Sequence, residues 1–163
     1  MLQVGQKVPV FSVTNQDGDE ITNENLLGSK YIIFFYPKDD SPGCTKQACS
    51  VRDNSRKITK YGYRIFGVSP DKEAKHYKFI DKYELGFDLL ADPEKGMIQA
   101  FEAWGTKKFM GREIVGVKRF TFFIDELGII TNIIDKVKTK EHGTEILNEI
   151  EKENQQLHLR VKG

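Results

Sequence analysis

The sequence predicts an α/β fold in which a mixed central β-sheet is flanked by α-helices. From Tyr31 onward, short apolar segments alternate with segments of helical periodicity, which is the pattern of β-α-β units around a largely parallel sheet. Two further apolar segments near the C-terminus are separated only by a short turn, so an antiparallel hairpin is expected there. The 163 residues are expected to form a single domain over 1–163.

Composition is that of an ordinary soluble protein. Hydrophobic residues make up 39% of the chain, charged residues 30%, and the net charge is +1. This balance argues against nucleic-acid or membrane partners. The apolar runs are too short to span a bilayer, and the first residues lack the features of a secretory signal, so the expected location is cytoplasmic.

The first strand with a strong signal covers Tyr31–Tyr36, a β-branched and aromatic run that Pro37 ends. Residues 1–30 before it predict irregular or hairpin structure, with turn signals at Asn15–Gly18 and a helical turn at Asn23–Leu27.

A helix is predicted directly after the polar turn that follows this strand. Ser41 suits the N-cap, Pro42 suits the first helical position, and the helix can continue toward Gly62. This arrangement places Cys44 in the first turn of the helix.

The next segments alternate again, with strands over Tyr63–Val68 and Phe87–Ala91 and helices over Asp71–Tyr83 and about 92–101. The last of these helices begins with an Asp-Pro pair, which suits a cap followed by the first helical position.

The final third begins with Trp104–Lys118, which has no clear period and is predicted to be a long loop. Strands over Arg119–Asp125 and Gly128–Val137 form the expected hairpin. A helix over Glu141–Asn154 and a loose tail over 155–163 complete the chain.

Cys44 is a candidate nucleophile because of its position. Unpaired backbone N–H groups and the positive end of the helix dipole stabilise an anion in the first turn, and for a cysteine that anion is the reactive thiolate. The alternative is that Cys44 is a small buried apolar residue.

Cys49, the other of the two cysteines, follows five residues later. On an ideal helix the two would be about 7.5 Å apart along the axis and about 140° apart around it. A disulfide between them would therefore require local unwinding. The spacing is neither the C-x-x-C of thioredoxin-type motifs nor that of a zinc site, so no metal is expected.

The residues around Cys44 resemble those of a known family. The string FYPKDDSPGCTKQAC contains the P-x-x-x-[TS]-x-x-C signature of peroxiredoxins and is similar to the bacterioferritin comigratory protein or peroxiredoxin Q branch. The likeness extends to VGQKVPVF, FGVSPD, LLADP, WGTKKFMG and GVKRFTFFIDELG. It implies a thioredoxin-like fold.

The resemblance also implies an activity. The protein would be a thiol peroxidase that reduces hydrogen peroxide and organic hydroperoxides, in antioxidant defence, without a cofactor. Cys44 would become a sulfenic acid, and Cys49 would resolve it as an intramolecular disulfide. Thioredoxin or a glutaredoxin-like reductant would restore both thiols, and a monomer is favoured.

Three further site residues follow from the resemblance. Arg119 matches the family's active-site arginine, although a surface residue at a strand end is an equal alternative. The Ser41 hydroxyl would contact peroxide or cap the helix, and Pro37 would shield the thiolate as well as end the strand. Gln47 stands where the family usually has glutamate, which removes a carboxylate expected to orient the arginine.

The remaining candidates are weaker. His76, His142 and His158 are expected at the surface. Trp104, Phe109 and Met110 are candidates for lining the reductant or substrate approach, with packing as the simpler role. Two rival functions are a protein disulfide reductase, which the cysteine spacing disfavours, and a redox-gated sensor or binding protein.

Overall fold

The computed structural model describes the chain from Met1 to Lys162, with side chains described as far as Leu159. The elements follow the chain as β1 (Ser12–Asn15), β2 (Glu20–Thr22), β3 (Lys30–Phe35), α1 (Pro42–Lys60), β4 (Tyr63–Ser69), α2 (Glu73–Tyr83), β5 (Asp88–Ala91), α3 (Gly96–Ala100), β6 (Trp104–Phe109), β7 (Arg112–Val117), β8 (Thr121–Ile124), β9 (Ile130–Ile134), a 3-10 turn (Thr139–Glu141) and α4 (His142–Lys162).

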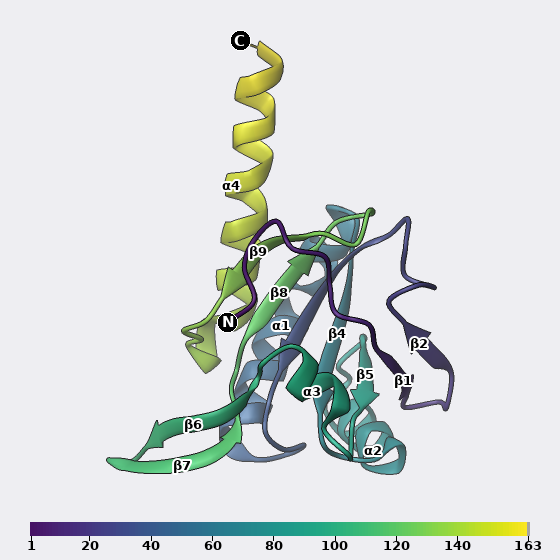
Figure 1. Ribbon diagram of the computed structural model, residues 1–163, viewed down its shortest axis with the longest axis vertical. Helices are drawn as coiled ribbons and strands as arrows, with labels where there is room; N and C mark the ends of the chain where they lie inside the picture. Colours follow the sequence, from purple (N-terminus) through teal and green to yellow (C-terminus); the bar gives the residue numbers. More distant parts are fainter. Residues whose placement is uncertain (163) are drawn as a thin grey trace.

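Seven strands form the central sheet in the order β2-β1-β5-β4-β3-β8-β9 (Figure 1). β3 pairs with β4, and β4 with β5, in parallel, whereas β8 is antiparallel to both β3 and β9. The predicted mixed sheet and C-terminal hairpin are therefore confirmed.

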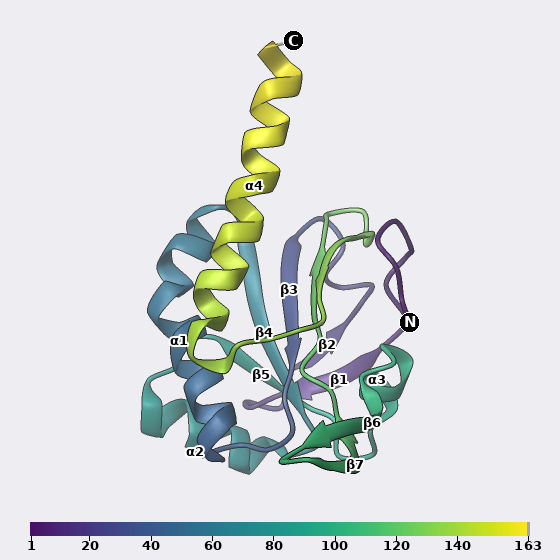
Figure 2. The ribbon, with the colours of Figure 1, turned by 90° about the vertical axis from the view of Figure 1, so that its left-hand side faces the viewer.

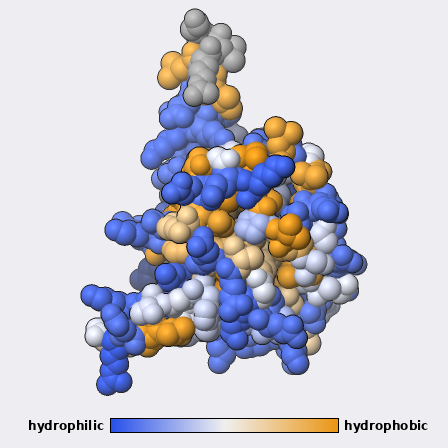
Figure 3. Space-filling model, viewed as in Figure 1, coloured by the Kyte–Doolittle hydropathy of each residue, from blue (hydrophilic) through white to orange (hydrophobic). Residues whose placement is uncertain are grey.

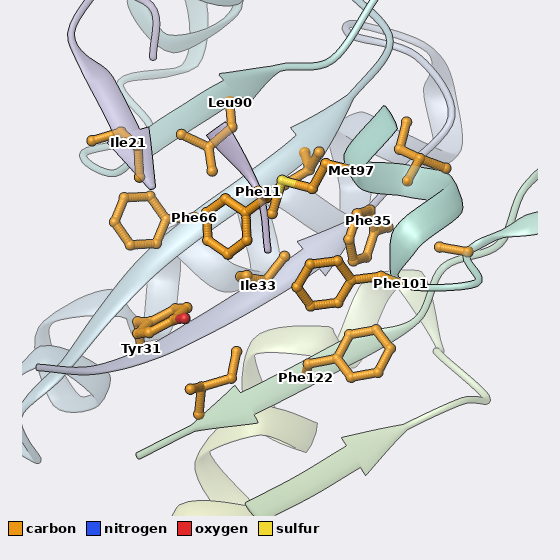
Figure 4. Close-up of a cluster of buried hydrophobic side chains, with 14 of the residues drawn as sticks. Phe11, Ile21, Tyr31, Ile33, Phe35, Phe66, Leu90, Met97, Phe101 and Phe122 are labelled. Carbon is orange, nitrogen blue, oxygen red and sulfur yellow. The ribbon is translucent and has the colours of Figure 1, made fainter. Parts of the chain in front are cut away.

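β3 divides the core between the two faces of the sheet. Tyr31, Ile33 and Phe35 belong to one buried cluster, and Ile32 and Phe34 belong to the other, because successive strand residues point to opposite faces. Figure 2 shows α1, α2 and α4 on one side of the sheet and α3 on the other. The α3 side is closed by aromatic packing, which Figure 4 shows around Phe35, Phe101 and Phe122.

α1 packs against α4, and the contact is tight at one point. The amide of Gly143 donates to Ser50 Oγ at 2.9 Å. A Cβ at position 143 would lie 2.1 Å from the Ser50 carbonyl oxygen, so only glycine fits. This contact fixes the middle of α1 to the start of α4.

The prediction of a long loop over Trp104–Lys118 is wrong. The segment forms the two-stranded sheet of β6 and β7, with a turn at Met110 and Gly111, whose φ angles are 52° and 78°. The hairpin extends away from the body of the molecule (Figure 1), and hydrophilic and hydrophobic residues lie side by side on it (Figure 3). Its strands are largely exposed, so they lack the apolar alternation that marks a half-buried strand.

Two other boundaries differ from prediction. The helix expected from Asp92 begins only at Gly96, because the Asp92 carboxylate accepts a hydrogen bond from the Ile98 amide rather than capping a helix that starts at Pro93. The helix expected to end at Asn154 continues to Lys162 as α4, so the residues of the expected tail are helical as far as Lys162; Gly163 lies outside the described residues.

Within residues 1–162, none of the helices combines the length and the apolar character needed to cross a bilayer.

Candidate active site

The β3–α1 connection places Cys44 at the centre of the candidate site. Ser41 is the N-cap residue, with extended φ and ψ of −79° and 154°, and Pro42 begins the helix as predicted. Cys44 is the third residue of α1, where the first-turn N–H groups have no partner within the helix. Its side chain is only 1% exposed, so the sulfur lies in a site that excludes bulk water.

Arg119 reaches this sulfur from a distant part of the sequence. Its Nη1 lies 3.3 Å from Cys44 Sγ, within hydrogen-bond range. The sheet register explains the meeting: Phe34 near the end of β3 pairs with Thr121 at the start of β8, so Arg119, two residues before β8, lies beside the start of α1. Arg119 therefore does more than lie at the surface at the end of a strand, which was the alternative for this residue.

Gly43 makes room for the guanidinium. A Cβ at this position would lie 3.0 Å from Arg119 Nη2, closer than ordinary packing allows. A glycine immediately before the candidate nucleophile therefore lets the cation approach the first turn of α1.

Gln47 holds Arg119 despite lacking a charge. Its Oε1 accepts a hydrogen bond from Arg119 Nη1 at 2.6 Å, and the residue is fully buried. The carboxylate that usually orients the arginine is absent, and the amide oxygen of Gln47 takes its place as acceptor. Gln47 adds no negative charge, so the positive charge of Arg119 is not neutralised by this contact.

Lys107 is a second cation near the site, and the sequence reasoning missed it. Its Nζ donates to the Val117 carbonyl at 2.7 Å, so it crosses the base of the β6–β7 hairpin. Burial, and after it repulsion from Arg119, lower the pKa of Lys107 below its ordinary value. The Cys44 sulfur acts in the opposite direction and raises this pKa. The sequence reasoning treated 104–118 as a loop and so could not place Lys107, which reaches the site because β6 pairs with β7.

The Ser41 hydroxyl does not cap α1. It donates to the Lys38 carbonyl at 2.9 Å and makes no capping bond. The N-cap prediction is right for the backbone position and wrong for the side chain. Pro37 is half-buried and lies two residues after the end of β3, directly after the buried Tyr36.

Cys49 lies in the next turn of α1 and is half-buried. Both cysteines are free, and α1 is continuous from Pro42 to Lys60. The two thiols are therefore on different sides of an intact helix, as the five-residue spacing requires. Among the described residues, no three His, Cys, Asp or Glu side chains are grouped as metal ligands.

Two of the three histidine predictions are wrong, since His76 and His142 are fully buried; His158 is exposed as expected. His142 Nε2 lies 2.8 Å from Thr121 Oγ1 and its Nδ1 lies 3.1 Å from Glu145 Oε1. Burial lowers the pKa of His142, so a neutral ring can accept from the threonine and donate to the glutamate. This contact ties the start of β8, beside Arg119, to α4.

The three aromatic and apolar candidates are spread along the β6–β7 hairpin. Trp104 is half-buried and packs against the core on the α3 side of the sheet. Phe109 and Met110, at the tip of the hairpin, are 59% and 88% exposed. A role for them in the approach of a partner stays a prediction.

A buried cysteine at a helix start, facing an arginine that an amide holds in place, makes this a candidate thiol-based reactive site. Residues 4–133 match the AhpC/TSA family, so the chain belongs to that family. The putative peroxiredoxin bcp of Haemophilus influenzae is 42% identical over 147 residues, covering 90% of this chain and 95% of that protein. The peroxiredoxin Bcp of Escherichia coli is 39% identical over 147 residues, covering 90% and 94%.

Solved structures agree with this assignment. The bacterioferritin comigratory protein of Xanthomonas campestris, for which alkyl peroxide reduction activity is described, matches with a TM-score of 0.80 and 27% identity, covering 88% of this chain and 91% of that one. The expectations of a thioredoxin-like fold and of a relationship to the Bcp and peroxiredoxin Q branch are confirmed.

Proposed function

We propose that this protein is a thiol peroxidase that reduces hydrogen peroxide and organic hydroperoxides, with Cys44 as the nucleophile. The observation that carries the proposal is the 3.3 Å contact between Arg119 Nη1 and Cys44 Sγ at the start of α1. Two independent sources of positive potential, the helix N-terminus and the guanidinium, act on one sulfur. Membership of the peroxiredoxin-containing family supports the same chemistry.

The first step transfers two electrons from sulfur to peroxide. The Cys44 thiolate attacks one peroxide oxygen, the O–O bond breaks, and the other oxygen leaves as hydroxide or alkoxide and takes up a proton. Cys44 becomes a sulfenic acid. The remaining N–H groups of Arg119 and the amide of Cys44 can donate to the oxygens as negative charge develops on them. Ser41 and Pro37 complete the proposed site as polar contact and shield.

Cys49 is proposed to resolve the sulfenic acid. Its thiol attacks the Cys44 sulfur, water leaves, and a Cys44–Cys49 disulfide forms. An external dithiol, such as thioredoxin or a glutaredoxin-like protein, then reduces the disulfide and is itself oxidised. Because the two residues lie on different sides of α1, the start of the helix must unwind before the bond can form.

This unwinding gives the first prediction. On oxidation, the amides of residues 45–49, the first that are hydrogen-bonded within the helix, should lose protection from hydrogen exchange, and far-UV helix signal should fall, since these residues leave the helix. Residues 56–60, in the last turn of the same helix, serve as the internal control and should stay protected. Equal protection of residues 45–49 in the reduced and oxidised proteins would contradict a Cys44–Cys49 disulfide.

A turnover assay tests the proposed function. With thioredoxin, thioredoxin reductase and NADPH, the protein should consume many equivalents of hydrogen peroxide, and NADPH oxidation should match peroxide loss. A redox-gated sensor would consume about one equivalent and then recycle slowly. The second outcome, with several dithiol reductants tried, would exclude a peroxidase cycle and favour the sensor.

A further inference from the structure

We propose that Asp39 and His76 form a buried clamp that positions the Pro37–Ser41 loop, and through it the first turn of α1, for attack by Cys44 on peroxide. The proposal rests on the proposed function and adds two positioning residues to it. Neither residue contacts the Cys44 sulfur. Their effect would reach the reaction through the backbone that connects β3 to α1.

Asp39 is the centre of the clamp and is 2% exposed. Its Oδ1 accepts from the Tyr36 hydroxyl at 2.5 Å, and its Oδ2 lies 2.6 Å from His76 Nδ1. Its backbone amide donates to Asp71 Oδ2 at 2.7 Å. The side chain and backbone of one loop residue are thus held from three directions.

His76 brings α2 into this arrangement. The residue is fully buried, and its Nε2 lies 2.9 Å from the Leu90 carbonyl oxygen, which can only accept a hydrogen bond. Nε2 must therefore donate, and a second proton occupies the contact between Nδ1 and the Asp39 carboxyl. Both ring nitrogens are used, and removing either partner would leave a polar group buried without a hydrogen bond.

The other polar groups of the cluster are also satisfied. Asp71, which holds the Asp39 amide, accepts from the Ser69 hydroxyl at 2.7 Å and from Lys75 at 2.9 Å. Burial, followed by the Asp39 carboxylate, raises the pKa of Tyr36 well above its usual value, so its hydroxyl remains a donor. A buried network whose hydrogen-bonding groups are all satisfied holds its side chains in a single arrangement, because any other arrangement would break hydrogen bonds.

The loop needs such support because its own backbone is strained. Asp40 has a φ of 60°, in the left-handed region that a residue with a side chain occupies at a cost. Ser41 makes no side-chain cap, and the first turn of α1 contains no acidic residue. The placement of that turn thus depends on the loop, whose last carbonyl, that of Ser41, accepts from the Thr45 amide at 2.8 Å.

A second contact between the loop and α2 provides a matched control. Asp40 accepts hydrogen bonds from Lys82 at 2.8 Å and from Tyr83 at 2.6 Å. The Lys82 side chain is 58% exposed, so solvent screens its ion pair with Asp40. Both contacts join the same loop to the same helix, but only the Asp39–His76 contact is buried.

The test uses two replacements of His76 that keep different halves of the imidazole. The amide nitrogen of asparagine corresponds to Nδ1, so His76→Asn retains a donor for Asp39. The amide nitrogen of glutamine corresponds to Nε2, so His76→Gln retains the bond to Leu90 and loses the donor to Asp39. Both variants remove ring volume from the core, so a merely structural role for His76 predicts similar behaviour.

The measurement is the rate constant for reaction of reduced Cys44 with hydrogen peroxide, recorded beside urea unfolding. We expect His76→Gln to react about ten- to a hundredfold more slowly than His76→Asn. Displacement of a reacting group by about 1 Å can lower a rate constant by a factor of this size. Lys82→Met should react like the wild type. Asp39→Asn, which keeps the shape of the side chain, should be slowed like His76→Gln.

The outcomes separate the two proposals. If peroxide does not react at Cys44 in the wild-type protein, the proposed function fails. If the wild type reacts and the folded fractions of His76→Gln, His76→Asn and Asp39→Asn all react at its rate, the clamp alone fails. Should His76→Gln not fold, equal rates for Asp39→Asn and the wild type would still overturn the clamp.

Discussion

Replacement of Cys44 by serine is expected to abolish peroxide reduction, whereas Cys49→Ser should retain a single reaction with peroxide. Only the first cysteine lies at the helix start beside Arg119, so only it is expected to supply the attacking thiolate. The second should consume about one equivalent and stop at the sulfenic acid or a higher oxidation state. Mass spectrometry of the oxidised variants, together with peroxide consumption, would measure both.

The two variants should therefore differ in the first turnover and agree only in lacking sustained activity. Circular dichroism of the reduced variants is the control for folding, since Cys44 is buried and Cys49 is half-buried. Full turnover by Cys44→Ser with the same reductant would overturn the assignment of the nucleophile.

Arg119→Met is expected to slow the reaction with peroxide about a hundredfold or more, as loss of one preorganised donor does in other enzymes. The variant also removes the cation 3.3 Å from the sulfur, so alkylation of Cys44 should slow as well. Arg119→Lys should keep a positive charge near the sulfur and still react slowly with peroxide, because a single ammonium cannot reproduce the planar, directed donors of a guanidinium. The measurements are the rates of Cys44 alkylation and of peroxide reduction.

Gln47→Glu complements this series by changing charge without removing the acceptor. It keeps an acceptor for Arg119 Nη1 in a buried position and should therefore retain the contact, while its negative charge offsets that of the guanidinium. If Arg119→Met changes neither alkylation nor rate, the catalytic cation must be another group. Lys107, whose pKa responds to the Cys44 sulfur, would then be the first to replace, ahead of Arg112, which is exposed on β7.

Much of the fold could be predicted because its signals are local. The aromatic run before Pro37 predicts β3, and Ser41 and Pro42 predict the start of α1, since each depends on neighbouring residues alone. The β6–β7 hairpin could not be predicted in this way. Its strands are largely exposed, so burial imposes little pattern on their side chains, and the two strands pair with each other along their whole length.

The sequence alone also could not predict that His76 and His142 are buried. His76 is tolerated inside the protein because Asp39, 37 positions earlier, and Leu90, 14 positions later, satisfy both ring nitrogens. His142 similarly depends on Thr121, 21 positions before it. A buried polar side chain needs partners, and partners this far apart are set by the packing of elements rather than by spacing along the chain.

By itself, the sequence determined that Cys44 stands in the first turn of a helix and that Cys49 cannot reach it while that helix is intact, because both facts follow from local helix geometry. The tertiary structure decided what surrounds the thiol. The antiparallel pairing of Phe34 with Thr121 brings the start of β8 beside the end of β3, and so brings Arg119 to the sulfur across 75 positions of sequence. Contacts between residues so far apart depend on strand register, which is set by the whole buried face of the sheet.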